Sequence, residues 1–345
     1  MPFFSVISCL YNVSNFFQNG ISCLLNQSFK DYEIILVDDG STDTTGLLAD
    51  RVATQHKNIR VIHQKNAGPG AARNAGIKVA NGRYLCFYDM DDVVRRDWLQ
   101  IIYREIVDCL PRIGVFGYRE INEKYHSSVA FEFPRMLLST NEEIGKVFPG
   151  LLSGITFNNG FVWNKVYERD FILKHNILFP DLKIQQDEVF NHRAYKHADS
   201  LLLIPEVLYE YHVYESGNNR SRFIHNRLKC FITVRDSFLH LLNYWECNDG
   251  DMINYIHSRF IFNSFFNRNP HKGLKSHKED IAGILKTHEI EESGNILKDN
   301  NFRKHSSFTK LYLRCMRRQS LWGMFAIDCV LSLKTKAKGF IRHFR

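Results

Sequence analysis

Two short runs of aspartate are the residues in this chain best suited to bind a metal or a nucleotide. Asp89 and Asp91 are two residues apart with Asp92 beside them, and Asp38 and Asp39 form an earlier pair. Carboxylate oxygens are hard ligands that suit Mg²⁺ or Mn²⁺ on a diphosphate. Such a metal neutralises charge as a nucleoside diphosphate departs. Taken singly, either run is also typical of a solvated turn.

The elements around these runs favour the functional interpretation. Short apolar segments with the pattern of buried strands occupy residues 3–9, 33–37, 59–62 and 84–88. Helical signals begin after Ser14, a candidate N-cap, at Ser41 and at Pro69, and extend over residues 98–109. This alternation predicts an α/β fold with a doubly wound, mostly parallel sheet. Ligands bind beyond the carboxyl ends of the strands in such sheets, where both aspartate runs lie.

A glycine-containing segment, residues 66–74, follows the third predicted strand. Its glycines permit close backbone approach to a ligand, and Arg73 is placed to face phosphates or the edge of a base. The dinucleotide-binding fingerprint G-x-G-x-x-G would instead follow the first strand, where the chain has no glycine. A nicotinamide-dependent dehydrogenase is therefore disfavoured.

Other motifs join these in order along the chain: Tyr11-Asn12, Gln27-Ser28-Phe29, residues 33–43, Gly70-Ala71-Ala72-Arg73-Asn74, residues 89–92 and Trp163-Asn164-Lys165-Val166-Tyr167. Together they resemble family 2 glycosyltransferases with the GT-A fold, especially the bacterial lipopolysaccharide, O-antigen and capsule enzymes. The resemblance is dense over residues 3–100 and thinner as far as residue 215. It implies a Rossmann-like sheet followed by a helical C-terminal extension.

The resemblance also implies roles for individual residues. Tyr11, Asp38 and Asp39 would hold the nucleobase, usually uracil. Asp89 would contact the ribose, and Asp91 would ligate Mn²⁺ or Mg²⁺, with Asp89 and Asp92 as further ligands. The remaining nucleotide-sugar contacts would come from Arg73, in the segment that closes over the nucleotide, and from His212 and Arg220.

Sugar transfer also needs a base beside the molecule that receives the sugar. The attacking hydroxyl must lose its proton, and a carboxylate within hydrogen-bond reach can take it. The resemblance places this base at Asp187, although the usual preceding Glu is Gln186 in this chain. Glu188 is a rival one residue on. The structural alternative for Asp187 is an acid in the first turn of a helix, favoured by the helix dipole.

These expectations combine into an inverting, metal-assisted single displacement. A sugar would pass from a UDP-sugar to a hydroxyl of a growing cell-surface glycan or lipid-linked glycan. Two alternatives from other classes stay open. A nucleotidyltransferase would also use paired acids, but its glycine-rich phosphate loop after the first strand is missing. A non-catalytic nucleotide-sugar binding protein would need no base.

Charge and composition organise the rest of the chain. The 345 residues are 44% hydrophobic, which supports a large core. We expect a GT-A domain over 1–222, divided into a nucleotide-binding half (1–120) and an acceptor half (121–222). A helical region with a basic amphipathic tail should occupy 223–345. Residues 301–345 hold eleven Lys and Arg and one acid, a net charge of +10, while residues 1–300 carry −2, so the chain's net charge of +8 comes from the tail.

Aromatic residues interleaved with this positive charge predict contact with a membrane surface. The alternative is a helix packed on the enzyme, and no motif supports binding to nucleic acid. The eight cysteines form no C-x-x-C pair, which suits a reducing cytosol. We see no signal peptide and no apolar stretch long enough to span a bilayer. The expected location is cytoplasmic, peripheral on the cytoplasmic face of the inner membrane.

Overall fold

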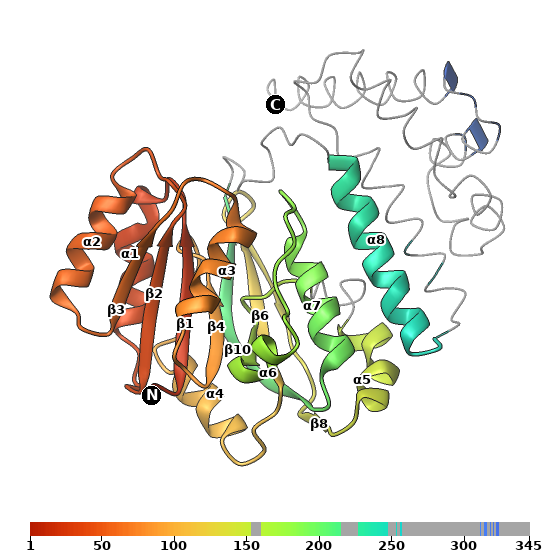
Figure 1. Cartoon of the computed structure of the whole chain (residues 1–345), viewed down its shortest axis with the longest axis horizontal. Helices are drawn as coiled ribbons and strands as arrows, with labels where there is room; N and C mark the ends of the chain where they lie inside the picture. The colour runs from red at the N-terminus through yellow and green to blue at the C-terminus, as the bar shows by residue number, and fades with distance from the viewer. Residues whose placement is uncertain are drawn as a thin grey trace. The chain divides into compact units, whose positions relative to one another are not determined.

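The computed structural model describes residues 1–152, 160–214 and 227–247, and isolated positions beyond residue 252 (Figure 1). The chain divides into two compact units. One comprises Met1–Arg220 with His240–Glu246, and the other Ser221–Leu239 with Cys247–Arg345. The predicted divisions at residues 120 and 222 stay predictions. None of the helices in the described ranges is both long and apolar enough to cross a membrane.

The first hundred residues alternate strand and helix, as predicted. The elements are β1 (Phe4–Leu10), α1 (Ser14–Leu25), β2 (Tyr32–Asp38), α2 (Thr45–Gln55), β3 (Ile59–His63), α3 (Pro69–Val79), β4 (Tyr84–Tyr88), β5 (Val93–Val94) and α4 (Trp98–Ile106). The four longer strands pair in parallel in the order β3-β2-β1-β4. This confirms the Rossmann-like, doubly wound half of the fold.

The following residues extend the same sheet with mixed pairing. They form β6 (Ile113–Asn122), β7 (Ser127–Phe131), β8 (Met136–Leu138), α5 (Asn141–Val147), a π-helical turn (Phe148–Leu152), β9 (Lys165–Glu168), α6 (Arg169–Lys174), α7 (Gln186–His197) and β10 (Leu201–Val213). β9 joins β4 and β6 in antiparallel register, and β10 pairs in parallel with β6. The longest helix described, α8 (Arg227–Tyr244), confirms the predicted helical pattern after residue 223.

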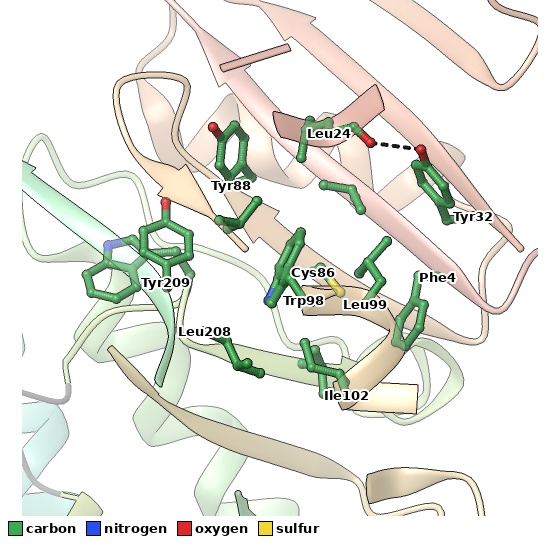
Figure 2. Close-up of a cluster of buried hydrophobic side chains, with 14 of the residues drawn as sticks. Phe4, Leu24, Tyr32, Cys86, Tyr88, Trp98, Leu99, Ile102, Leu208 and Tyr209 are labelled. Carbon is green, nitrogen blue, oxygen red and sulfur yellow. Dashed lines mark hydrogen bonds between the residues drawn. The ribbon is translucent and has the colours of Figure 1, made fainter. Parts of the chain in front are cut away.

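Alternation along the strands gives the sheet two apolar faces. Phe4 and Val6 of β1 belong to a core cluster that also takes in Leu24 of α1 and Trp98 of α4 (Figure 2). In this cluster the Tyr32 hydroxyl donates to the Leu24 carbonyl at 2.8 Å. The strands are therefore buried on both sides, as parallel strands usually are.

The opposite face carries α3 and α7. A side-chain carbon at Gly76 of α3 would lie 2.4 Å from Ile7 of β1, so only glycine permits this approach. On the same face Phe87 of β4 packs against Phe190 of α7, with ring centroids 5.9 Å apart. Close packing of α3 on β1 fixes the position of the side chains at its first turns.

Two predicted helix starts are corrected. Ser14 is the first residue of α1 and not its N-cap, which is Val13. The hydroxyl and acid at residues 41–43 precede α2, which begins at Thr45. Asp43 accepts a hydrogen bond from the Thr45 amide at 2.9 Å, so it still supports the start of that helix. Turn chemistry before the helix explains the difference, because these side chains satisfy backbone groups outside it.

Gln27 ties α1 to α4 through a fully buried side chain. Its Nε2 donates to the carbonyls of Cys23 at 3.0 Å and Arg95 at 2.8 Å. Its Oε1 accepts from the Leu99 amide at 3.1 Å, at the start of α4. This residue therefore serves the fold, and a buried amide with all its partners is expensive to remove.

Replacing Gln27 with alanine should lower the free energy of unfolding by about 2–4 kcal/mol, because buried backbone groups lose their partners and a cavity opens. The loss is measured as a shift of the urea unfolding midpoint. Gln18→Ala, at an exposed position of α1, is the matched control and should leave the midpoint nearly unchanged. Equal shifts for the two variants would contradict the structural role of Gln27.

Candidate active site

The carboxyl ends of three strands bring the predicted site residues to one edge of the sheet. In the β1–β2 pairing Leu10 stands opposite Asp38, and in the β1–β4 pairing Ser8 stands opposite Tyr88. The residues that follow each strand are Tyr11, Asp39 and Asp89. Since neighbouring parallel strands end together, this edge collects their polar side chains.

The Asp38 carboxylate is buried and bonded within the protein. It accepts from the Ser41 amide at 3.1 Å and meets Nδ1 of His63 at 3.0 Å, while His63 Nε2 meets Asp50 at 2.9 Å. Burial works to raise the pKa of Asp38, but Ser41 and His63 outweigh it and lower the pKa. Hydrogen bonds to Asp50 and Asp38 raise the pKa of His63. Asp38 thus fastens β2 to β3, and its nucleobase contact stays a prediction.

Asp39 fastens the glycine-containing segment that follows β3. Its Oδ1 accepts from Gln64 Nε2 at 2.7 Å and from the Ala67 amide at 2.9 Å, and its Oδ2 accepts from the Gly68 amide at 2.8 Å. Gly68 has φ +96°, a conformation that favours glycine and turns the chain into α3. Asp39 therefore shapes the wall of the site, and a direct contact with the base stays a prediction.

The loop after β1 is locked to the segment after β2. Asn12, with φ +54°, accepts through Oδ1 from the Thr42 amide at 2.8 Å and from the Asp43 amide at 3.3 Å. Its own amide donates to Ser41 Oγ at 3.1 Å. Tyr11 is half-buried next to this anchor. Sequence reasoning marked the Tyr11-Asn12 pair but not the part that Asn12 plays in fixing the loop.

One buried arginine joins the donor-side acids to the predicted base. Arg73, 5% exposed, donates through Nη1 to Asp187 Oδ1 at 2.6 Å and through Nη2 to Asp89 Oδ1 at 3.2 Å. Its guanidinium carbon lies 5.4 Å from the centre of the Phe179 ring. The structure thus brings together residues from α3, from the end of β4 and from α7, which are separated by up to 114 positions in sequence.

Burial and charge oppose each other in this bridge. Burial raises the pKa of Asp187, and Asp89 adds to it, while Arg73 and Lys165 work against the rise. Burial works to lower the pKa of Arg73, but Asp187 and Asp89 outweigh it and raise the pKa above its ordinary value. A raised pKa makes a carboxylate a stronger proton acceptor.

Asp91 and Asp92 are adjacent but have different surroundings. Asp92 is 3% exposed, and its carboxylate accepts from the Tyr209 hydroxyl at 2.8 Å and the His212 amide at 2.9 Å. Burial, with Asp91 and Asp89 close by, raises the pKa of Asp92 well above its usual range. Asp92 therefore holds β10 against the end of β4 in this structure, and the geometry favours Asp89 and Asp91 over Asp92 as metal ligands.

His212 lies at the end of β10, beside these acids. Its ring Nδ1 is 2.7 Å from the Glu123 carboxylate, so this side chain is engaged with the loop between β6 and β7. The neighbouring Tyr214 hydroxyl donates to the Asp91 carbonyl at 3.0 Å. Arg220, the other predicted diphosphate contact, lies outside the described residues.

Comparisons with known proteins place part of the chain in a family. Residues 5–160 match the model of glycosyl transferase family 2. Residues 5–160 belong to a family 2 glycosyltransferase domain. The chain is 33% identical to the uncharacterized glycosyltransferase EpsJ of Bacillus subtilis over 213 residues. This aligned region covers 61% of each chain. The chain therefore spans less than two thirds of the length of this relative.

Solved structures share the fold of the family 2 domain. The crystal structure of S. aureus TarS 1–349 in complex with UDP-GlcNAc has a TM-score of 0.68 at 18% identity, covering 97% of this chain and 92% of that one. The mannosyltransferase PcManGT from Pyrobaculum calidifontis, in complex with GDP-Man and Mn²⁺, has a TM-score of 0.53 at 15% identity, covering 93% and 87%. The predicted GT-A fold is confirmed.

Two further residues of the candidate site had no role predicted from the sequence. Tyr209 accepts from the Asp89 amide at 3.2 Å while it donates to Asp92, so it holds both ends of the second aspartate run. Asn191, one helical turn after Asp187, accepts from the Tyr167 hydroxyl at 2.5 Å and donates to the carbonyl of Phe161 at 3.0 Å. The four-residue spacing on α7 is the signal that could have found Asn191.

Lys165 is a further buried basic residue near the predicted base. Its ammonium donates to the Phe161 carbonyl at 2.6 Å and to Asn164 Oδ1 at 2.8 Å. Burial lowers the pKa of Lys165 well below its ordinary value, and the charge of Asp187 opposes that change. The Trp-Asn-Lys motif thus places a lysine behind the predicted base.

The acids of the family 2 domain fit a metal shared with a substrate. Within the described ranges, no group of three or more His, Cys, Asp and Glu side chains is arranged to hold a metal by itself. Mg²⁺ and similar ions commonly bind through one or two carboxylates, with phosphates and water as the other ligands. Asp89 and Asp91 supply that number of carboxylates. The donor set therefore suits a metal that arrives with a diphosphate.

Proposed function

We propose that this chain is an inverting glycosyltransferase that moves a sugar from a UDP-sugar to a hydroxyl of a growing cell-surface glycan. The observation that carries the proposal is the Arg73 bridge, in which one side chain contacts both Asp89 and Asp187. A donor-side acid and a candidate base lie on either side of one guanidinium. That spacing suits a donor and an acceptor that meet between them.

The choice of donor is supported by the comparisons. TarS, which shares the fold over nearly the whole chain, was crystallised with UDP-GlcNAc. PcManGT, with a lower TM-score, was crystallised with GDP-Man. We favour a UDP-sugar because the TarS likeness is the stronger one. GDP-mannose should be assayed beside the UDP-sugars as the alternative donor.

The proposed reaction is a single displacement. The acceptor hydroxyl oxygen attacks the anomeric carbon as the bond from that carbon to the diphosphate oxygen breaks. Asp187 takes the hydroxyl proton, and UDP leaves with the bonding electron pair. No enzyme nucleophile is needed, and the configuration at the anomeric carbon is inverted. The second oxygen of Asp187 makes no hydrogen bond to the residues that the structure describes, so it is available for the proton.

A divalent metal would be held by Asp91 and Asp89. When bound it neutralises the charge that develops on the departing diphosphate. The chain's own residues then have separate tasks: Tyr209 holds the backbone at Asp89, and Asp92 holds β10 beside it. These contacts keep the second aspartate run at the sheet edge without using the Asp91 carboxylate.

The tail is proposed to contact an anionic membrane surface, which would suit a lipid-linked acceptor. This proposal is supported by the basic charge after residue 300 and by the aromatic residues among it. Most of the tail lies outside the described residues. Among the described positions, Leu311 and Trp322 are exposed, at 46% and 68%.

Asp187→Asn should lower kcat for sugar transfer by roughly 10²–10⁴-fold, because the hydroxyl loses its proton acceptor. UDP affinity should change little, since the base acts on the acceptor. Transfer is followed as UDP release with acceptor present, and UDP affinity by calorimetry. Asp170→Asn, on the exposed side of α6, is the control. Asp187 would not be the base if Asp187→Asn transferred sugar at the wild-type rate. It would also not be the base if Glu188→Gln lost transfer while Asp187→Asn kept it.

Asp91→Asn should abolish the gain in UDP affinity that Mn²⁺ provides, a loss of about tenfold or more. Burial, then the neighbouring Asp89, raises the pKa of Asp91 to about 6. A protonated carboxyl is a poor ligand, so the Mn²⁺-dependent part of UDP binding should fall as the pH drops through about 6. Calorimetry at several pH values, with exposed Asp108→Asn as control, measures both effects. Mn²⁺-dependent binding that persists in Asp91→Asn would exclude this ligand.

Removing three tail charges together (Arg314, Arg317 and Arg318 to Gln) should weaken binding to anionic vesicles by roughly a hundredfold, at about 1 kcal/mol per charge. Co-sedimentation with phosphatidylserine vesicles measures the change, and neutral vesicles are the blank. Arg104→Gln, which removes an exposed charge from the family 2 domain, is the control. Equal vesicle binding by the wild type and the triple variant would leave the tail without this role.

A further inference from the structure

The sequence predicts that Arg73 faces the nucleotide, and the structure adds the contacts that its side chain makes within the protein. It is 5% exposed, and two of its nitrogens contact two carboxylates, Asp187 Oδ1 at 2.6 Å and Asp89 Oδ1 at 3.2 Å. We infer that Arg73 is a positioning residue, which fixes the Asp187 carboxylate and couples it to Asp89 on the donor side. This inference rests on the proposed function, in which Asp187 is the base.

The guanidinium is held in a rigid frame. Asn74, the next residue of α3, donates to the Phe179 carbonyl at 3.0 Å and accepts from the Phe179 amide at 2.9 Å. Phe179 stacks on Phe190 of α7, with ring centroids 4.1 Å apart, and also lies under the Arg73 guanidinium. Helix α3, the segment before α7 and α7 itself are thus joined around Arg73, so its direction toward Asp187 is set by packing.

The shape of arginine matters here because one cation contacts two acids. A guanidinium presents several N–H groups in a fixed planar fork, whereas a lysine ammonium is a single compact charge. Asp187 has side-chain exposure of 17% and Asp89 of 32%, so water only partly screens the repulsion between them. Arg73 compensates both acids at once and fixes the angle between them.

As a consequence, the two oxygens of the Asp187 carboxylate have different roles. Oδ1 receives the short hydrogen bond from Arg73, which orients the group. Oδ2 is left to accept the proton of the acceptor hydroxyl. Because the same guanidinium contacts Asp89, a change on the donor side reaches the base through one side chain. The orientation of the Asp187 carboxylate therefore depends on Asp89 at the donor site as well as on helix α7, which carries Asp187.

The test compares Arg73→Gln and Arg73→Lys with Arg60→Gln. Arg60 is an exposed arginine whose guanidinium donates to the Val79 carbonyl, at the end of the same helix α3. For each variant, kcat and KM are measured with the donor and acceptor that the wild type uses, and UDP affinity is measured by calorimetry. Thermal unfolding of Arg73→Gln, Asp187→Asn and the double variant forms a cycle that needs no activity.

Arg73→Gln should lower kcat by about 100-fold, the cost typical of a misplaced catalytic group. The UDP dissociation constant should change far less than kcat. Arg73→Lys should recover little of the loss, because one ammonium does not span both carboxylates. In the cycle, Arg73→Gln should lower the melting temperature less in the Asp187→Asn background than in the wild type. Arg60→Gln should match the wild type in every measurement.

Two results would overturn the inference. One is a large rise in the UDP dissociation constant with kcat unchanged, which would make Arg73 a nucleotide contact. The other is additive losses of melting temperature in the cycle, which would mean that Arg73 and Asp187 are not coupled. If the wild type consumes no sugar nucleotide, the proposed function fails, but the cycle still decides whether the bridge exists. If Arg73→Gln does not fold, Arg73→Lys replaces it in the cycle.

Discussion

Carboxylates gathered at one edge of a sheet repel one another, and partial burial makes each charge more costly. Six aspartates meet this constraint here: Asp38, Asp39, Asp89, Asp91, Asp92 and Asp187. Compensation is local and different for each group. Backbone amides serve Asp39, a histidine serves Asp38, a tyrosine and an amide serve Asp92, and one arginine serves both Asp89 and Asp187. The other features of the site follow from how these donors are placed.

This compensation divides the aspartates into two groups. Asp38, Asp39 and Asp92 are buried, and their carboxylates close loops and join strands. Asp89, Asp91 and Asp187 are only partly buried, and these three are the residues that we propose for the metal and for the base. Asp39 holds the turn into α3, the helix that carries Arg73, and Asp92 holds β10 beside the second aspartate run. Neighbouring aspartates in the run at residues 89–92 thus differ in their contacts: Asp92 joins strands, while Asp89 and Asp91 are the proposed metal ligands.

The sequence was enough to predict the alternation of strands and helices and the motifs that follow the parallel strands. It also predicted that the aspartates lie beyond the carboxyl ends of these strands. Strand patterns and strand ends are local properties, so they can be read from neighbouring residues. The partner of each acid could not be predicted. Arg73 and Asp187 are 114 residues apart, and the amides of Ala67 and Gly68 reach Asp39 across 28 and 29 residues. Such contacts depend on how α3 and α7 pack on the sheet.

The most direct test of the account is a donor panel with Mn²⁺ present, in which UDP-sugars and GDP-mannose are compared by release of free nucleoside diphosphate. The account predicts that at least one UDP-sugar is consumed, that GDP-mannose is not, and that Asp91→Asn loses this activity. No consumption of any UDP-sugar, together with no binding of UDP in the presence of Mn²⁺, would contradict it.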